Sequence, residues 1–432
     1  MPYSLLEAKP IEELCKVVDC EHKTAPYVDE SEYLVVRTSN VRDGQLVMES
    51  MKYTTLEGYN EWTSRAVPEH GDVLFTREAR AGESCLVPSD TKVCMGQRMV
   101  MLRPHKSEVD PVFLSMILNT ERTKNDIYRL SIGSTVSRIN IADIKKLKVA
   151  SPPLLEQQKI AKILSTWDKA ISTTERLIEN SSQQKKALMQ QLLTGKKRLL
   201  STKSSFSVRD GFAKSKLGEL PDDWNVSLVS KFYWFQEGPG VRKHQFTETG
   251  VKLLNGTNIQ NSRVDLTTTK THISEEEAYG AYEHFLADSG DLIIACSGIS
   301  VDRFDEKIAF LEDQHLPLCM NTSTMRFKVK KNVQSSLEFL RYFMMSPLFK
   351  NQIRRQITGS AQLNFGPSHV GKCYIALPSY EEQQRIAAVL INADKEIDLL
   401  EKQLADLQQE KKALMQQLLT GKKRVVIDED NL

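Results

Sequence analysis

Two carboxylates and a lysine in the second half of the chain are of the types that a metal-dependent nuclease uses. Asp291 is followed by Asp305 and Lys307, and carboxylates beside a lysine can hold Mg²⁺ and orient a water molecule. Asp291 follows Gly290, and the equivalent Gly71-Asp72 pair in the first half of the chain is followed by no such trio. A turn before a strand is therefore the simpler interpretation of Gly-Asp, and a stand-alone metal-dependent nuclease is kept as an alternative function.

Other catalytic patterns are incomplete in this sequence. Ser151-Pro-Pro-Leu154 lacks the asparagine and the aromatic residue of an amino-methyltransferase motif, and Gly195-Lys-Lys197 lacks the spacing of a phosphate-binding loop. Cys15, Cys20 and His22 are the nearest approach to a ligand cluster, but their spacing fits no common zinc site. The sequence therefore predicts no catalytic residue, metal or cofactor in this chain, and a binding protein is the preferred class.

Composition places the chain among ordinary globular proteins of more than one domain. It has 432 residues, 40% of them hydrophobic and 26% charged, and its net charge is only +2, so any surface that attracts nucleic acid must be local. The seven cysteines are scattered without a C-x-x-C pair, and no apolar run approaches the roughly 20 residues of a membrane-spanning helix. These features predict a cytoplasmic protein.

The chain is a tandem repeat. Residues 185–198 recur letter for letter as residues 411–424, an offset of 226, and at the same offset the Glu-Gln-Gln of residues 156–158 recurs at residues 382–384. Upstream of these segments the similarity becomes weak. The order is therefore globule, tail, globule, tail, and the tails agree while the globules have diverged.

Each tail is predicted to form one helix of roughly 42 residues, about 60 Å long at about 1.5 Å per residue. Pro152 and Pro153 suit its first turn, and Gly195 and Gly421 suit the two helix ends. Between them, residues recur at alternating spacings of four and three, which is the pattern of a coiled coil. The predicted seam consists of Ile160, Leu164, Trp167, Ile171, Ile178, Lys185, Leu188 and Leu192, with Ile386, Leu390, Ile397, Leu400, Leu404, Leu407, Lys411, Leu414 and Leu418 in the second helix.

Two lysines interrupt this seam at equivalent positions. Polar residues in a coiled-coil seam cost stability but can fix register and partner number. We therefore expect leucine at both Lys185 and Lys411 to raise the melting temperature.

The globules combine short apolar runs, bounded by Gly, Asn and Asp, with helical stretches near residues 112–119 and 337–345. The predicted fold class is α+β: two globules in tandem repeat, each followed by a long helix, with the two helices pairing as an antiparallel coiled coil. The predicted boundaries are 1–150 for the first globule, 151–198 for the first spacer helix, 199–216 for a linker, 217–376 for the second globule, 377–424 for the second spacer helix and 425–432 for a tail.

This arrangement resembles the specificity subunit of type I restriction-modification systems, the HsdS family, over nearly the whole chain. The resemblance is carried by the two copies of proline, a short apolar step and Glu-Gln-Gln (residues 152–158 and 378–384) and by the two Leu-Leu-Thr-Gly-Lys segments. The second globule also opens with Leu220-Pro-Asp-Asp-Trp224, similar to the usual domain entry of the family. In the first globule only Ile11-Glu-Glu-Leu14 hints at that entry.

The resemblance implies a non-catalytic subunit in a phage-defence complex. Each globule would be a target recognition domain that reads one half of a split, asymmetric sequence in double-stranded DNA. The helices would bind two methyltransferase subunits, and restriction and translocase subunits would join the complex. S-adenosylmethionine, ATP and Mg²⁺ would belong to those partners. A scaffold that binds proteins instead of DNA is the remaining alternative.

Candidate DNA contacts are polar and basic residues in loops beside the strands, because Arg and Asn can pair with guanine and adenine edges while Lys mostly positions phosphates. In the first domain we predict His22, Lys23, Arg37, Asn40, Arg42, Arg77, Arg80 and Arg138; in the second we predict Arg242, Lys243, His244, Asn255, Asn258, Arg303, Gln362 and Asn364.

Overall fold

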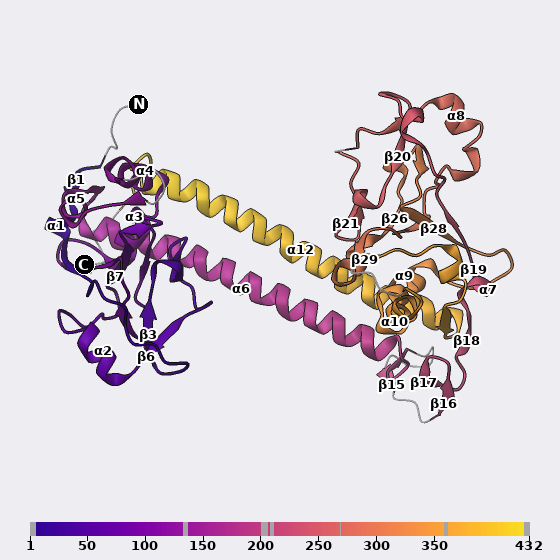
Figure 1. Ribbon diagram of the computed structural model, residues 1–432, viewed down its shortest axis with the longest axis horizontal. Helices are drawn as coiled ribbons and strands as arrows, with labels where there is room; N and C mark the ends of the chain where they lie inside the picture. Colours follow the sequence, from indigo (N-terminus) through magenta and orange to yellow (C-terminus); the bar gives the residue numbers. More distant parts are fainter. Residues whose placement is uncertain are drawn as a thin grey trace. The chain divides into compact units, whose positions relative to one another are not determined.

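The computed structural model describes residues 6–132, 137–199, 206–207, 211–267, 269–357 and 362–426. The chain divides into two compact units, each described here by itself: unit 1 is Met1–Arg176 with Lys402–Leu432, and unit 2 is Leu177–Glu401. Each unit contains one globule and parts of both long helices, α6 (Leu154–Leu192) and α12 (Tyr380–Leu418) (Figure 1). The predicted α+β fold class with two paired long helices is confirmed.

Each globule is built on an antiparallel four-stranded sheet, and the two sheets have the same strand order. In unit 1 the order is β2 (Cys15–Asp19), β11 (Met99–Pro104), β7 (Val73–Thr76) and β9 (Ser84–Leu86). In unit 2 it is β19 (Tyr233–Glu237), β28 (Thr324–Val329), β24 (Leu292–Ala295) and β26 (Ile308–Phe310).

A three-stranded sheet also recurs, with one parallel and one antiparallel pair in each unit. In unit 1, β3 (Tyr33–Val36) lies between β10 (Lys92–Met95) and β6 (Lys52–Thr54). In unit 2, β20 (Val251–Leu254) lies between β27 (Leu318–Met320) and β23 (His272–Ile273). The two globules therefore share a topology that their diverged sequences conceal.

Short pairs and helices complete each globule. Unit 1 adds β1 (Ala8–Pro10), α1 (Ile11–Leu14), β4 (Val41–Arg42), β5 (Gln45–Leu46), α2 (Leu56–Trp62), β8 (Glu78–Ala79), α3 (Pro111–Leu118), α4 (Glu121–Leu130), β12 (Ser137–Arg138), α5 (Ile141–Lys146) and β13 (Lys148–Ala150). Unit 2 adds β14 (Arg198–Leu199), β15 (Phe206–Ser207), β16 (Phe212–Ser215), β17 (Gly218–Pro221), β18 (Asn225–Leu228), α7 (Val229–Phe232), β21 (Ile259–Gln260), β22 (Arg263–Val264), α8 (Glu275–Tyr279), β25 (Ile299–Ser300), α9 (Leu337–Met345), α10 (Pro347–Gln356), β29 (Gln362–Leu363), α11 (Pro367–Val370) and β30 (Tyr374–Leu377).

Residues 11–14 and 220–224, which the sequence suggests as equivalent entries to the two globules, are not equivalent in the structure. Residues 11–14 form α1, which follows β1 and precedes β2, so their counterpart in unit 2 is α7 and not residues 220–224. The first part of the latter segment belongs to a hairpin of β16 and β17. Residues 212–215 of the predicted linker therefore pair with the second globule.

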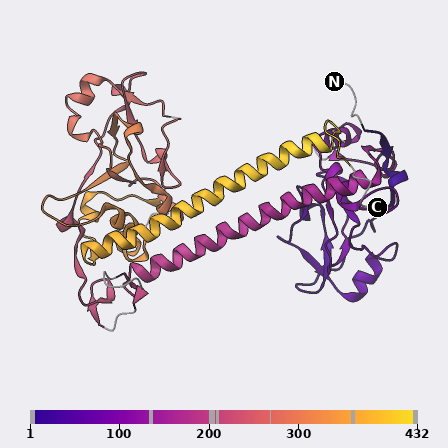
Figure 2. The same ribbon diagram turned by 180° about the vertical axis from the view of Figure 1, so that it is seen from behind.

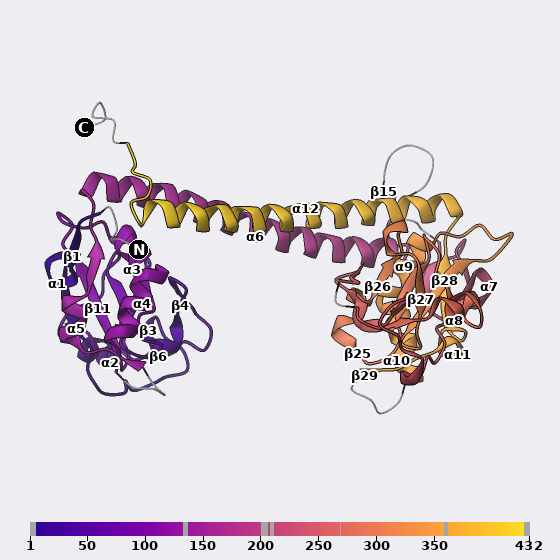
Figure 3. The ribbon, with the colours of Figure 1, turned by 90° about the horizontal axis from the view of Figure 1, so that it is seen from above.

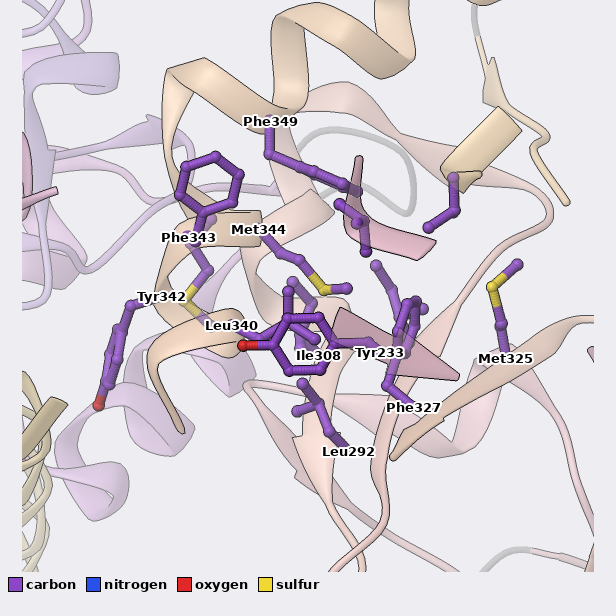
Figure 4. Close-up of a cluster of buried hydrophobic side chains, with 14 of the residues drawn as sticks. Tyr233, Leu292, Ile308, Met325, Phe327, Leu340, Tyr342, Phe343, Met344 and Phe349 are labelled. Atoms are coloured by element: carbon purple, nitrogen blue, oxygen red, sulfur yellow. The ribbon is translucent and has the colours of Figure 1, made fainter. Parts of the chain in front are cut away.

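An aromatic and methionine-rich core lies between the sheet and the helices of unit 2. Strand residues such as Leu292 and Phe327 pack against Leu340 and Phe343 of α9 and Phe349 of α10 (Figure 4). The Tyr233 hydroxyl, fully buried in this core, donates a hydrogen bond of 2.9 Å to the carbonyl oxygen of Ser336. Because this partner satisfies the phenol, the core can bury a tyrosine without an unpaired polar group.

The Glu-Gln pair of each repeat attaches the globule to the start of its long helix. In unit 1, the Gln157 side chain accepts from the Asp110 backbone N–H at 3.0 Å and donates to the Pro152 carbonyl at 2.7 Å. In unit 2, Gln383 accepts from the Ser336 backbone N–H at 3.0 Å and donates to the Pro378 carbonyl at 2.9 Å. The repeated motif is thus a buried joint made with backbone groups.

The long helices end at the predicted glycines. Gly195 has φ +66° and Gly421 has φ +72°, the left-handed conformation that favours glycine after a helix. There is also no room for a side chain, because a Cβ at Gly195 would lie 2.2 Å from Cγ of Pro221 and one at Gly421 would lie 2.5 Å from Cγ of Leu6.

Each unit pairs the start of one long helix with the end of the other, so the two segments run antiparallel (Figures 2 and 3). All predicted seam residues are buried or half-buried, with Ile160, Leu164 and Leu192 fully buried, as are Ile386 and Leu390. The lysines are not isolated in the seam. Lys411 forms an ion pair with Asp168 in unit 1, and its repeat equivalent Lys185 forms one with Asp394 in unit 2.

We still expect Lys185→Leu with Lys411→Leu to raise the melting temperature. Partly exposed ion pairs contribute only about 0.2–1 kcal/mol, whereas a buried leucine side chain contributes about 1.5–3 kcal/mol. Thermal unfolding of the double variant measures the balance. The control is Lys185→Gln with Lys411→Gln, which breaks the same ion pairs without adding apolar surface and leaves the contacts of Asp394 with Tyr342 and Arg341 in place. It should lower the melting temperature; an equal fall in the leucine variant would contradict the expectation.

In the described part of the chain, no helix is both long and apolar enough to cross a membrane.

Candidate nucleic-acid interface

A charged network surrounds the end of strand β2 in unit 1. The Asp19 carboxylate accepts a hydrogen bond from Nη1 of Arg77 at 3.2 Å and lies 2.9 Å from Nε2 of His22. Arg77 is buried, and His22 is exposed. The structure therefore joins two predicted contact residues, His22 and Arg77, through an aspartate that the sequence did not single out.

A second acidic residue organises the neighbouring pair of short strands, β8 and β12. The Glu78 carboxylate lies 3.3 Å from Nε of Arg138 and 3.1 Å from Nε of Arg98. Arg80, at the end of the same turn, is exposed, and among the residues described none forms a hydrogen bond or an ion pair with its guanidinium. Arg80, Arg98 and Arg138 together give this end of the globule a basic surface.

Three possible metal ligands meet in the first network. Oxygen, sulfur and nitrogen atoms of Asp19, Cys20 and His22 all lie within 4.8 Å of one another, whereas Cys15 is not part of the group. Burial raises the pKa of the Cys20 thiol, which disfavours the thiolate that a metal would need. Because Arg77 already neutralises Asp19, a hydrogen-bonded network explains the group without a metal.

Asn40 and Asn258 correct the sequence prediction. Asn40 is fully buried: its amide donates to the carbonyls of Val47 and Glu49, and its oxygen accepts from the Arg37 backbone. Asn258 is 7% exposed and makes the equivalent contact with the backbone N–H of Asn255. Both asparagines hold a turn after a strand, so their side chains have no free atoms to offer to DNA bases.

The other predictions in unit 1 lie at the surface. Lys23 is 3.6 Å from Glu61, Arg42 is 4.0 Å from Glu49, and Arg37 donates to the carbonyl of Ser50 at 2.5 Å. These exposed contacts are weak enough to exchange for phosphate. All three side chains stay predicted DNA contacts.

In unit 2, predicted contacts gather where β25 pairs with β29. Gln362 lies in β29, and Asn364 follows it; the Asn364 side-chain oxygen accepts from the backbone N–H of Gly298 at 2.8 Å and from the Ser297 hydroxyl at 2.9 Å. These are the strands that correspond to β8 and β12 of unit 1. The polar ends of the two globules are therefore built from equivalent elements.

The remaining predictions in unit 2 lie in short 3-10 helices or directly before them. Arg242, Lys243 and His244 are consecutive and exposed, and no described residue forms a hydrogen bond or an ion pair with their side chains. Arg303 is paired with Glu306 at 2.8 Å, and the oxygen of Asn255 accepts from Asn321 at 2.8 Å. Arg242 and Lys243 are therefore two adjacent positive charges without an ion pair among the described residues.

Glu237 ends strand β19, shortly before Arg242 in the chain. It is half-buried, and within the described ranges its carboxylate has neither a hydrogen bond nor an ion pair. Its Oε2 lies 3.1 Å from the position that a Cβ would take at Gly366. Burial raises the pKa of the Glu237 carboxyl.

The nuclease candidates have separate structural partners. Asp291 is buried against Arg326 at 3.2 Å, Asp305 pairs with Lys350 at 2.9 Å, and Lys307 donates to the Ile259 carbonyl at 2.6 Å. The carboxylate of Asp291 also accepts from the Asp288 backbone N–H, just as Asp72 accepts from that of Glu69. Gly-Asp therefore closes a turn in both globules, and the trio makes no joint site.

Sequence reasoning missed Asp19, Glu78 and Glu237. The predicted contacts are polar and basic residues in loops, whereas these three residues are acidic and lie in strands. The strand register identifies two of them as equivalent: Asp19 pairs with Val100 and Glu237 with Met325, at matching places in the two sheets. An acidic residue that follows the same apolar strand in both repeats was the available signal.

Comparisons with known proteins agree over most of the chain. Residues 4–180 and 221–409 match the family described as the type I restriction modification DNA specificity domain. The specificity subunit of the type I restriction enzyme MjaVIII from Methanocaldococcus jannaschii is 29% identical over 93% of this chain and 89% of its own.

Two solved structures share the fold. The S subunit of a type I restriction-modification system from M. genitalium has 14% identity and a TM-score of 0.55, covering 98% of this chain and 97% of that one. A chain from a study of complex assembly in a type I R-M system has 16% identity and a TM-score of 0.56, covering 98% of this chain and all of that one. With both globules matched by one family, this chain belongs to the type I restriction-modification DNA specificity subunits, the non-catalytic DNA-recognition components of these systems.

Proposed function

We propose that each globule reads one half of a split DNA sequence and that the helix pair binds two methyltransferase subunits. The observation that carries the first part is the combination of one topology with different polar groups. Among the described residues, equivalent strand ends present Asp19 with Arg77 in unit 1 and Glu237 without a cation in unit 2. Two similar frames with different surface chemistry suit two different half-sites.

The second part is supported by the identical helix ends. Lys186 in unit 2 and Lys412 in unit 1 are repeat equivalents, and both are exposed on their helices. Equivalent surfaces can bind two copies of one partner with pseudo-twofold symmetry. S-adenosylmethionine, ATP and Mg²⁺ are expected on the methyltransferase and on the restriction and translocase subunits that join the complex.

Native mass spectrometry with purified methyltransferase tests this stoichiometry. We expect two copies at saturation for the unaltered chain, weakened binding of one copy for Lys186→Glu or Lys412→Glu, and weakened binding of both for the double variant. Competition with unrelated duplexes tests sequence preference in the same complex. One copy at saturation, or binding without sequence preference, would contradict the proposal.

A further inference from the structure

Glu237 has no counter-charge among the described residues, and the basic segment that follows it is predicted to contact DNA. Glu237 is immediately followed by the segment that carries the exposed Arg242, Lys243 and His244. Phosphate oxygens would repel it, and half-burial adds a desolvation cost. A residue that is costly in the free protein is expected to have a partner in the functional complex.

The equivalent position in unit 1 shows which partners are missing in unit 2. In the sheet of unit 1, Asp19 pairs with Val100, and Val100 pairs with Phe75 on its other side. Arg77, which neutralises Asp19, lies two residues after Phe75. The residue two beyond Ile294, at the matching place in unit 2, is Cys296.

The second partner is also replaced. His22 lies three residues after Asp19, whereas the third residue after Glu237 is Gly240. Arg77 and His22, the two side chains that contact Asp19, therefore have no counterparts at the equivalent positions of the second globule.

Glycines replace bulk around this carboxylate. Gly238 and Gly240 follow Glu237 in the chain, Gly238 packs against the backbone of Asn321, and Gly366 lies against Oε2 of Glu237. Glycine allows a ligand to approach the backbone closely. Asn364, which holds Gly298 in place, is itself a predicted base contact.

The chemistry of the site selects one kind of base edge. An ionised carboxylate only accepts hydrogen bonds, so its partner must donate them. In the major groove, guanine O6 and N7 and thymine O4 are acceptors, and only the amino groups of cytosine N4 and adenine N6 donate. Adenine N6 lies beside the acceptor N7, which repels the second carboxylate oxygen, so cytosine N4 is the usual partner of Glu. We propose that Glu237 is a specificity residue of the second half-site and accepts a hydrogen bond from the N4 amino group of a cytosine; this inference rests on the proposed half-site reading.

The test uses the full chain in complex with its methyltransferase and a DNA library with a randomised second half-site. Glu237→Ala should lower the cytosine preference at one position by about tenfold, which corresponds to about 1.4 kcal/mol, because the variant keeps no acceptor for the amino group. Glu237→Gln should shift the preference at that position toward adenine, because an amide matches adenine N6 and N7. The control is Glu276→Gln, which removes the same negative charge at an exposed position of α8. This variant should leave the sequence preference unchanged.

Thermal unfolding separates a binding effect from misfolding. Glu237→Gln removes a half-buried charge, so its melting temperature should equal or exceed that of the unaltered protein. An unchanged second half-site in both Glu237 variants would overturn the inference while leaving the proposed function intact, and so would changes confined to the first half-site. Loss of the native preference in EDTA would assign the carboxylate to a cation and overturn it as well. An unaltered complex without any bipartite preference would overturn the proposed function itself, and this inference with it.

Discussion

Replacing Arg198 with alanine is expected to lower the free energy of unfolding of unit 2 by about 3–5 kcal/mol. The Arg198 side chain is 2% exposed, and its guanidinium donates to both oxygens of Glu382, which is 1% exposed, at 2.7 Å. Asp223 accepts two further hydrogen bonds at 3.0 and 3.1 Å. Removal of the arginine leaves a buried carboxylate at the start of α12 without its cation.

The repeat supplies a matched control for this change. Arg424 donates to Glu156 at 2.8 and 2.6 Å in unit 1, but its side chain is 52% exposed. Arg424→Ala opens Glu156 to water, so we expect a smaller loss of about 1–2 kcal/mol. Calorimetric unfolding of both variants, with hydrogen exchange to assign the loss to one unit, makes the comparison. Equal losses would show that burial does not decide the strength of these pairs.

The control also has a pH dependence of defined sign. Arg424 lowers the pKa of the Glu156 carboxyl below its ordinary value. The ion pair between Arg424 and Glu156 therefore contributes fully to stability above the pKa of the carboxyl in the unfolded chain, about 4.3. This contribution is lost as the pH falls below that value. The stability difference between the unaltered protein and Arg424→Ala should close in this acidic range.

Exchange of the first globule should change one half-site completely and leave the other unaltered. The structural reason lies at the joint: the Gln157 side chain contacts the backbone of Glu108, Asp110 and Pro152. Backbone contacts place no demand on the side chains of an incoming globule. Residues 1–150 from a related specificity subunit should therefore dock on α6 and bring their own base contacts.

The paired helices could be predicted from the sequence because helix contacts repeat locally along the chain. Alternating spacings of four and three identify the seam within each helix, and the glycines mark its ends. The partners of the seam lysines could not be predicted, because the match of Lys185 with Asp394 depends on the axial alignment of two segments far apart in sequence.

The globules were predicted only as α+β, since their strands are short and their pairing is non-local. Asn40 illustrates the consequence for the site: its residue type suits adenine, but a fold that buries it uses every atom of its amide in a turn. Glu237 illustrates the reverse, because only the register of its strand shows that Arg77 has no counterpart beside it. Residue type alone decides neither case.

Sequencing of modified bases in DNA methylated by the exchanged complex tests the central claim most directly. DNA from cells with the native chain should carry modification at one bipartite sequence, and DNA from cells with the exchanged residues 1–150 should carry it at a sequence that keeps the native second half and has a new first half. Modification at a sequence in which both halves have changed, or at the unaltered native sequence, would contradict independent reading by the two globules.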